Sequence, residues 1–122
     1  MKKILIADDS QTMRVFIKIF MKKLAGVRVT EATDGFDAIE KIKNEDFDLI
    51  ITDINMPRMD GLQLIGSIRG MGIETPIIIL STRGEERDVE KGLSLGANDY
   101  VTKPITGHTF TSTVMNYIST AA

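Results

Sequence analysis

Short apolar runs, separated by longer amphipathic stretches, form the main pattern of the chain. Four of these runs do not alternate with polar residues, as is typical of strands buried on both faces. They are Ile4 to Ala7, Leu49 to Ile51, Ile77 to Leu80 and Tyr100-Val101. A fifth run, Val27 to Glu31, alternates apolar and polar residues, which predicts a strand at a sheet edge with one side nearer to solvent.

Between these runs, apolar residues recur at intervals of three and four, which predicts five helices that each bury one face. We expect the phenylalanines of the first helix to lie in the core. The five apolar faces are Met13, Phe16, Ile17, Phe20 and Leu24; Ala38, Ile39 and Ile42; Leu62, Ile65 and Ile68; Val89 and Leu93; and Phe110, Val114, Tyr117 and Ile118.

A strand followed by a helix, five times over, predicts a single doubly wound α/β fold. Its five-stranded sheet would be parallel, with five helices on both faces and right-handed crossovers. In such sheets the functional crevice lies outside the carboxyl ends of the strands. The residues at the strand ends are therefore the ones that should carry chemistry.

Composition narrows the function classes. The 122 residues suffice for one domain, and 15 Lys and Arg against 17 Asp and Glu leave no basic field, so we expect no nucleic-acid partner. With no cysteine and a single histidine, any metal must bind to oxygen ligands. No apolar run approaches the ~20 residues that cross a bilayer, so we expect a cytoplasmic protein without a membrane partner.

Charged and hydroxyl side chains stand at the predicted strand ends. If the first and third strands are neighbours, ~4.8 Å apart, the repulsion between their acids must be relieved by protonation or by a cation. A hard divalent cation such as Mg²⁺ is the natural choice. A lysine and a hydroxyl could then hold phosphoryl oxygens while one carboxylate attacks phosphorus. The residues are Asp8 and Asp9, Asp53, Ser81, and Lys103 followed by Pro104.

Four motifs in this order resemble the receiver domain of two-component response regulators, in particular the stand-alone chemotaxis (CheY) type. The resemblance implies a flavodoxin-like sheet with strand order 2-1-3-4-5. It also implies one receiver domain over residues 1–122 with no output domain. The motifs are Ile4 to Ser10, Asp53 to Gly61, Ile79 to Thr82 and Gly96 to Pro104.

The resemblance assigns the acids. Asp53 would be the phosphoacceptor that becomes an aspartyl phosphate, with phosphohistidine of a histidine kinase as donor. Asp8, Asp9 and Asp53 would hold Mg²⁺ together with the backbone carbonyl of Asn55.

The resemblance also assigns the groups around the phosphoryl. Ser81 and Lys103 would bind it, and the Lys103-Pro104 peptide bond would be cis. Ser81 and Tyr100 would form the switch, in which the aromatic ring turns inward as the hydroxyl moves toward the phosphoryl group.

The function implied is that of a signalling switch rather than a turnover enzyme. It would act through a face formed by the fourth helix, fifth strand and fifth helix. From Pro104 to Ala122 the chain has no Asp, Glu, Lys or Arg, so we expect a monomer that docks a downstream target by neutral contacts. That target could be a flagellar motor switch, and a phosphatase is a further partner to consider.

Other interpretations stay open. The chain could be a Mg²⁺-dependent phosphatase with an aspartate nucleophile, or a degenerate receiver that binds its partner without phosphate. A flavin or nucleotide binder is disfavoured, because Asp8-Asp9 stands where a glycine-rich phosphate cradle would be needed. Asp8-Asp9-Ser10 could merely cap a helix and Tyr100 could be a plain strand aromatic. Glu31 and Glu85 are expected on solvated faces.

Overall fold

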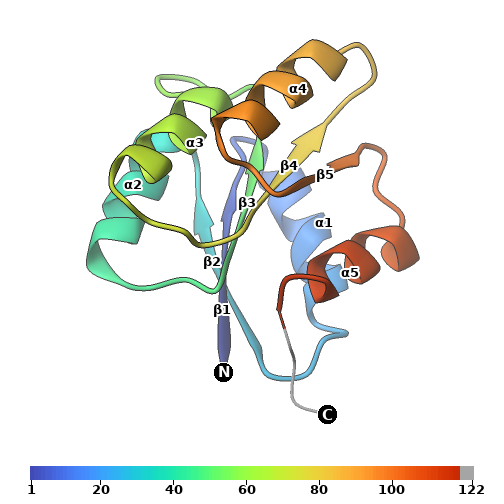
Figure 1. Ribbon diagram of the computed structural model, residues 1–122. Helices are drawn as coiled ribbons and strands as arrows, with labels where there is room; N and C mark the ends of the chain where they lie inside the picture. Colours follow the sequence, from blue (N-terminus) through green and yellow to red (C-terminus); the bar gives the residue numbers. More distant parts are fainter. Residues whose placement is uncertain (119–122) are drawn as a thin grey trace.

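The computed structural model describes residues 1–118, which form one parallel sheet covered by helices on both faces (Figure 1). The strands lie in the order β2-β1-β3-β4-β5 and every neighbouring pair is parallel. This confirms the flavodoxin-like order. The strands are β1 (Lys2–Ala7), β2 (Val27–Ala32), β3 (Leu49–Asp53), β4 (Ile77–Ser81) and β5 (Asp99–Thr102).

Five helices alternate with the strands along the chain. Helices α1 and α5 cover one face of the sheet, and α2, α3 and α4 cover the other (Figure 1). Because both faces are covered, the residues of β1 from Ile4 to Ala7 are all buried: Ile4 and Ile6 join one core and Leu5 joins the other. The helices are α1 (Gln11–Met21), α2 (Gly35–Asn44), α3 (Gly61–Gly70), α4 (Glu86–Leu95) and α5 (Gly107–Met115).

Three residues expected in the core are exposed. Tyr100 is 47% exposed because β5 is an edge strand, while its neighbour Val101 is buried. Phe16 is 45% exposed, since the buried stripe of α1 runs through Ile17 and Met21; its ring packs edge-on against Phe20 instead. The expectation was also wrong for Leu93 of α4, which is 37% exposed.

Two helices are shorter than their apolar patterns predicted. Helix α1 ends at Met21, so Leu24 packs against the core from the following turn. Helix α5 ends at Met115, and the buried Ile118 lies beyond it. Apolar spacing identifies residues that face a core and does not fix where helical hydrogen bonding stops.

Three helices begin at capping side chains near the carboxyl ends of the strands. Ser10, Asp34 and Asp60 accept hydrogen bonds from the first turns of α1, α2 and α3, and Asp60 forms a reciprocal capping box with Gln63. These caps fix the loops that follow β1, β2 and β3.

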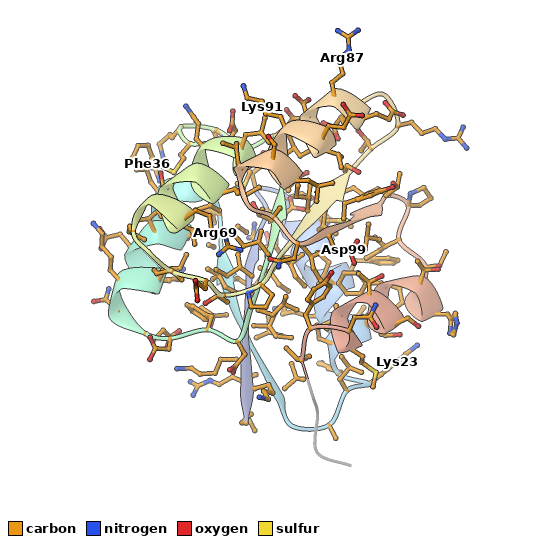
Figure 2. All side chains as sticks on the ribbon, viewed as in Figure 1. Lys23, Phe36, Arg69, Arg87, Lys91 and Asp99 are labelled. Carbon is orange, nitrogen blue, oxygen red and sulfur yellow. The ribbon has the colours of Figure 1, made fainter. Side chains whose placement is uncertain are left out.

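Arg69 joins α3 to the segment that enters β5. From α3 its guanidinium points inward (Figure 2), where it donates to the carbonyl oxygens of Gly96 at 3.0 and 2.9 Å and of Ile73 at 2.8 Å. It also donates to the carbonyl oxygen of Thr75 at 2.9 Å, so one guanidinium satisfies three carbonyl groups of helix ends and loops.

No helix in the part of the chain described is long and apolar enough to cross a membrane.

Gly61 is fixed by backbone proximity. A Cβ at this first residue of α3 would lie 2.1 Å from the carbonyl oxygen of Asp53. The amide of Gly61 also donates to the carbonyl oxygen of Ile54 at 2.8 Å. The start of α3 is therefore pressed against the end of β3, which sets the position of the loop between them.

We expect Gly61→Ala to lower the free energy of unfolding by about 1–3 kcal/mol, because backbone must shift to admit the methyl group. Gly66, within the same helix, has no atom within 4 Å of a built Cβ. Gly66→Ala should therefore raise stability by up to about 1 kcal/mol through helix propensity. Urea unfolding of both variants measures the contrast, and equal effects at the two positions would contradict it.

Candidate functional site

The parallel registers bring the acids to one end of the sheet. Ala7 of β1 pairs with Thr52 of β3, so the next residues along the two strands, Asp8 and Asp53, are neighbours. Carboxylate oxygens of Asp8, Asp9 and Asp53 all lie within 4.8 Å of one another. Asp53 and Ser81 are the last residues of their strands rather than the first residues after them.

Lys103 places its charge between two of these acids. Its Nζ lies 3.3 Å from Oδ2 of Asp53 and 3.7 Å from Oδ2 of Asp8. Its backbone amide donates to the carbonyl oxygen of Ser81 at 2.6 Å, which continues the β4·β5 ladder beyond Thr102. The Lys103–Pro104 peptide bond is cis, the isomer that the resemblance implies.

The pocket is buried at its base. Asp8 is fully buried and Asp53 is 8% exposed, whereas Asp9 is exposed. Burial raises the pKa of Asp53 above its ordinary value; the charge of Lys103 opposes this rise and the charge of Asp8 adds to it. Ionising the Asp53 carboxyl in the folded protein therefore costs free energy, and a nearby cation would reduce that cost.

The donor set fits a hard divalent cation. Among the described residues, Oδ2 of Asp8 is the one buried side-chain oxygen or nitrogen without a hydrogen-bond partner. It lies in a cluster whose carboxylates supply only oxygen donors, and Mg²⁺ is usually held by one or two carboxylates together with water. An unsatisfied anionic oxygen beside two other acids matches a metal ligand better than a purely structural role.

A network behind the pocket fixes the backbone of Asp8. The guanidinium of Arg14 donates to the carbonyl oxygen of Asp8 at 2.6 Å, and Ser10 donates its amide to Oδ1 of Asp8 at 2.9 Å. Glu31 of β2 holds Arg14 at 3.0 Å and Lys18 at 2.9 Å. The hydrogen bond from Lys18 lowers the pKa of Glu31 despite partial burial. The expectation of a solvated Glu31 thus holds only in part: its side chain is 35% exposed, but its carboxylate pairs with two cations.

The loop between β3 and α3 carries Asn55 and is held from outside. Arg58 within it adopts a left-handed conformation with φ of 64°, which is uncommon for a residue other than glycine. Its Nε donates at 2.7 Å to the buried carboxylate of Asp34, and its guanidinium lies over the ring of Phe36. This ion pair compensates for the unusual backbone and anchors the loop to α2.

Glu85 reaches across from the loop that follows β4. Its Oε1 accepts from the amide of Thr82 at 2.6 Å and from the Thr82 hydroxyl at 2.8 Å, and its Oε2 accepts from the side-chain amide of Asn55. Burial raises the pKa of Glu85, but these hydrogen bonds outweigh it and leave the pKa below its ordinary value. The expectation of a solvated Glu85 holds only in part: the side chain is partly exposed, but both of its oxygens are held by other residues. The Thr-x-x-Glu spacing resembles that of a capping box, although Glu85 is itself the N-cap residue of α4.

Ser81 and Tyr100 border one hollow between α4 and β5. Ser81 is 2% exposed, and Tyr100 presents its ring at the surface. The hollow has a volume of about 360 Å³, and its lining includes Ser81, Thr82, Val89, Leu93, Tyr100 and Thr102. An empty space beside the aromatic ring leaves room for that ring to change rotamer.

Comparison with known proteins agrees with this arrangement. Residues 4–115 match the model of the response regulator receiver domain. Chemotaxis protein CheY1 of Helicobacter pylori is 42% identical over 107 residues, which cover 85% of this chain and 86% of that protein. The sensor protein EvgS of Escherichia coli is 44% identical over 103 residues, 84% of this chain but only 8% of the sensor's length.

Solved structures show the same fold. The high-resolution structure of chemotaxis response regulator CheY4 of Vibrio cholerae superposes with a TM-score of 0.88 at 32% identity, covering 97% of this chain and 99% of that one. Receiver domains are signalling proteins rather than turnover enzymes. The family match over most of the chain, together with the pocket at the strand ends, shows that this chain belongs to the response regulator receiver family.

Proposed function

We propose that this chain is a signalling switch that accepts a phosphoryl group on Asp53 in a Mg²⁺-dependent reaction. The observation that carries the proposal is the meeting of Asp8, Asp9 and Asp53 with Lys103 at one end of the sheet. Three acids converging on a single lysine leave uncompensated negative charge. Such an arrangement is costly unless a cation binds there, and a bound cation would in turn attract an anionic phosphoryl group.

The donor is phosphohistidine of a histidine kinase. A carboxylate oxygen of Asp53 attacks phosphorus, forming a P–O bond while the P–N bond to the histidine breaks and the imidazole leaves. Lys103, now 3.3 Å from Asp53, is placed to hold a phosphoryl oxygen as a point charge. The hydroxyl of Ser81, at the end of the adjacent strand β4, is the second group assigned to the phosphoryl oxygens.

Asp8, Asp9 and Asp53 would hold the Mg²⁺ with the backbone carbonyl of Asn55. When bound, the ion neutralises charge that develops on the phosphoryl oxygens. The exposed carboxylate of Asp9 lies on the solvent side, and the buried carboxylate of Asp8 gains the partner that its Oδ2 lacks. Arg14 and Ser10 keep Asp8 in place for this role.

The signal leaves through the face formed by α4, β5 and α5. An aspartyl phosphate adds negative charge and acceptor oxygens, which favours an inward position of Ser81 and Tyr100. The hollow beside Tyr100 lies on this face, and its lining includes the charged residues Arg83, Glu86 and Glu90. Arg87 and Lys91 extend from α4 into solvent (Figure 2). Helix α5 contributes neutral residues, so the target is met by polar and apolar contacts there.

Chemotaxis is the pathway that the relatives favour. CheY1 of Helicobacter pylori and CheY4 of Vibrio cholerae are chemotaxis proteins, and each is matched over most of its length. By this argument the kinase is a chemotaxis histidine kinase and the target a component of the flagellar motor switch.

Intact-mass analysis tests the acceptor. With acetyl phosphate and Mg²⁺, the protein should gain the mass of one phosphoryl group, and neither Asp53→Ala nor a sample treated with chelator should gain it. Asp46 is exposed in the loop before β3, at the opposite end of the sheet, so Asp46→Asn should behave like the wild type. Absence of the adduct in the wild type would favour a receiver that acts without phosphate. Many turnovers of a phosphate ester would favour a phosphatase.

Removal of the Asp53 charge should stabilise the metal-free protein. An acid whose pKa is raised by folding opposes folding when ionised, and this cost disappears as pH falls through the folded pKa toward the ordinary value of 3.8. In chelator at neutral pH, Asp53→Asn should therefore unfold at higher urea than the wild type, with the gap closing in acid. A less stable Asp53→Asn under these conditions would contradict the electrostatic argument.

With Mg²⁺ present, the wild type should become more stable than Asp53→Asn. Binding to the folded state adds RT ln(1 + [Mg²⁺]/Kd), or about 1.4 kcal/mol at a tenfold excess over Kd. We expect this gain in the wild type and in Asp46→Asn, and a smaller one in Asp53→Asn. Urea unfolding at several Mg²⁺ concentrations measures it.

Tyr100 should become less accessible on phosphorylation. Tyr117→Phe leaves Tyr100 as the one tyrosine of the chain. The substitution removes the hydrogen bonds of the Tyr117 hydroxyl to Asp99 and Asn98, which should lower the free energy of unfolding by about 1 kcal/mol. In this variant, acrylamide quenching of tyrosine fluorescence should fall when acetyl phosphate and Mg²⁺ are added. The same addition to Tyr117→Phe combined with Asp53→Ala should change nothing. Unchanged quenching in a fully phosphorylated sample would rule out the ring movement.

A further inference from the structure

Glu85 binds two separate loops with its two oxygens. Oε1 accepts both hydrogen bonds from Thr82, which adjoins Ser81 in the loop after β4. Oε2 accepts from the side chain of Asn55, two residues after Asp53 in the loop after β3. The side chain therefore connects the two loops that flank the phosphoacceptor.

Helix capping does not explain this arrangement. Helix α4 begins at Glu86 with Glu85 as its N-cap residue, and no side-chain hydrogen bond caps it. Oε1 instead accepts from the amide and the hydroxyl of Thr82, three residues earlier in the loop. The contact between Oε2 and Asn55 is part of no helix end, because Asn55 belongs to another loop.

The contact lies on the solvent side of the pocket. Asn55 and Thr82 are exposed and Glu85 is partly exposed, while Asp53 and Ser81 are buried. Asp53 ends the strand before one of these loops and Ser81 ends the strand before the other, so a phosphodonor that approaches Asp53 between them would pass Glu85. It would meet a carboxylate there, and phosphodonors are themselves anionic.

We propose that Glu85 is a latch that restrains phosphorylation of Asp53 by tying Asn55 to Thr82 across the mouth of the pocket. This inference rests on the proposed function. The latch acts in two ways: its charge repels anionic donors, and its double contact with Thr82 resists the movement of the adjacent Ser81 toward the phosphoryl group. Gly84, with φ of 92°, gives the segment before Glu85 a conformation that favours glycine.

Phosphorylation kinetics test the latch. At saturating Mg²⁺, we expect Glu85→Ala to increase the rate constant for phosphorylation by acetyl phosphate roughly three- to tenfold. This is the fold-change that corresponds to the free energy of one partly exposed hydrogen bond to a charged group. Asn55→Ala removes the contact with Oε2 and leaves the Thr82 contacts and the backbone carbonyl, and should also increase the rate. Glu86→Ala is the matched control, because Glu86 is exposed and its one side-chain hydrogen bond is to Gly84.

The double variant tests the bridge. If Asn55 acts only through its contact with Glu85, Asn55→Ala should add nothing once Glu85 has been removed, and the double variant should resemble Glu85→Ala. Full additivity, or a Glu85→Ala rate equal to or below that of the wild type, would overturn the inference. Glu85→Gln keeps a side-chain oxygen for Thr82 and removes the charge. Its rate should exceed that of the wild type, and an equal rate would also overturn the inference. Failure of wild-type phosphorylation would instead refute the proposed function.

Discussion

Repulsion among three carboxylates is the constraint on which the functional end of this molecule depends. Asp8 and Asp53 lie in a buried position where their charges are poorly solvated, and Lys103 lies near both without neutralising both. Folding alone gives no reason to gather these groups. Under the proposed function a cation would, because its positive charge offsets the acids and in turn attracts an anionic phosphoryl group.

The rest of the fold supplies the stability that holds this unfavourable cluster in place. The central strands β1, β3 and β4 are buried on both faces by five helices, and this apolar burial is large enough to offset the cost of charged groups at one edge. Around the pocket, backbone contacts provide rigidity: Arg14 holds the Asp8 carbonyl, and Gly61 is pressed against the end of β3.

Much of this arrangement could be predicted from the sequence because it depends on periodicity. Uninterrupted apolar runs gave the buried strands, and parallel topology places all strand ends at one edge, so the positions of Asp53, Ser81 and Lys103 followed. Exposure was less predictable where an element lies at the margin: Tyr100 is on an edge strand, and Phe16 is one position away from the buried stripe of α1. The apolar pattern alone does not determine whether a residue at the margin of the core is buried or exposed.

Supporting polar residues were the hardest to predict. Glu31 and Glu85 have the same composition signal as any surface acid, and their partners lie 17 and 30 residues away along the chain. Such contacts depend on how loops approach one another, which no local spacing records. Under the proposed function, the acids at the strand ends would supply the phosphoryl chemistry. Contacts such as the one between Glu85 and Asn55 would then set how fast this receiver reacts, while the fold and the acids stay the same.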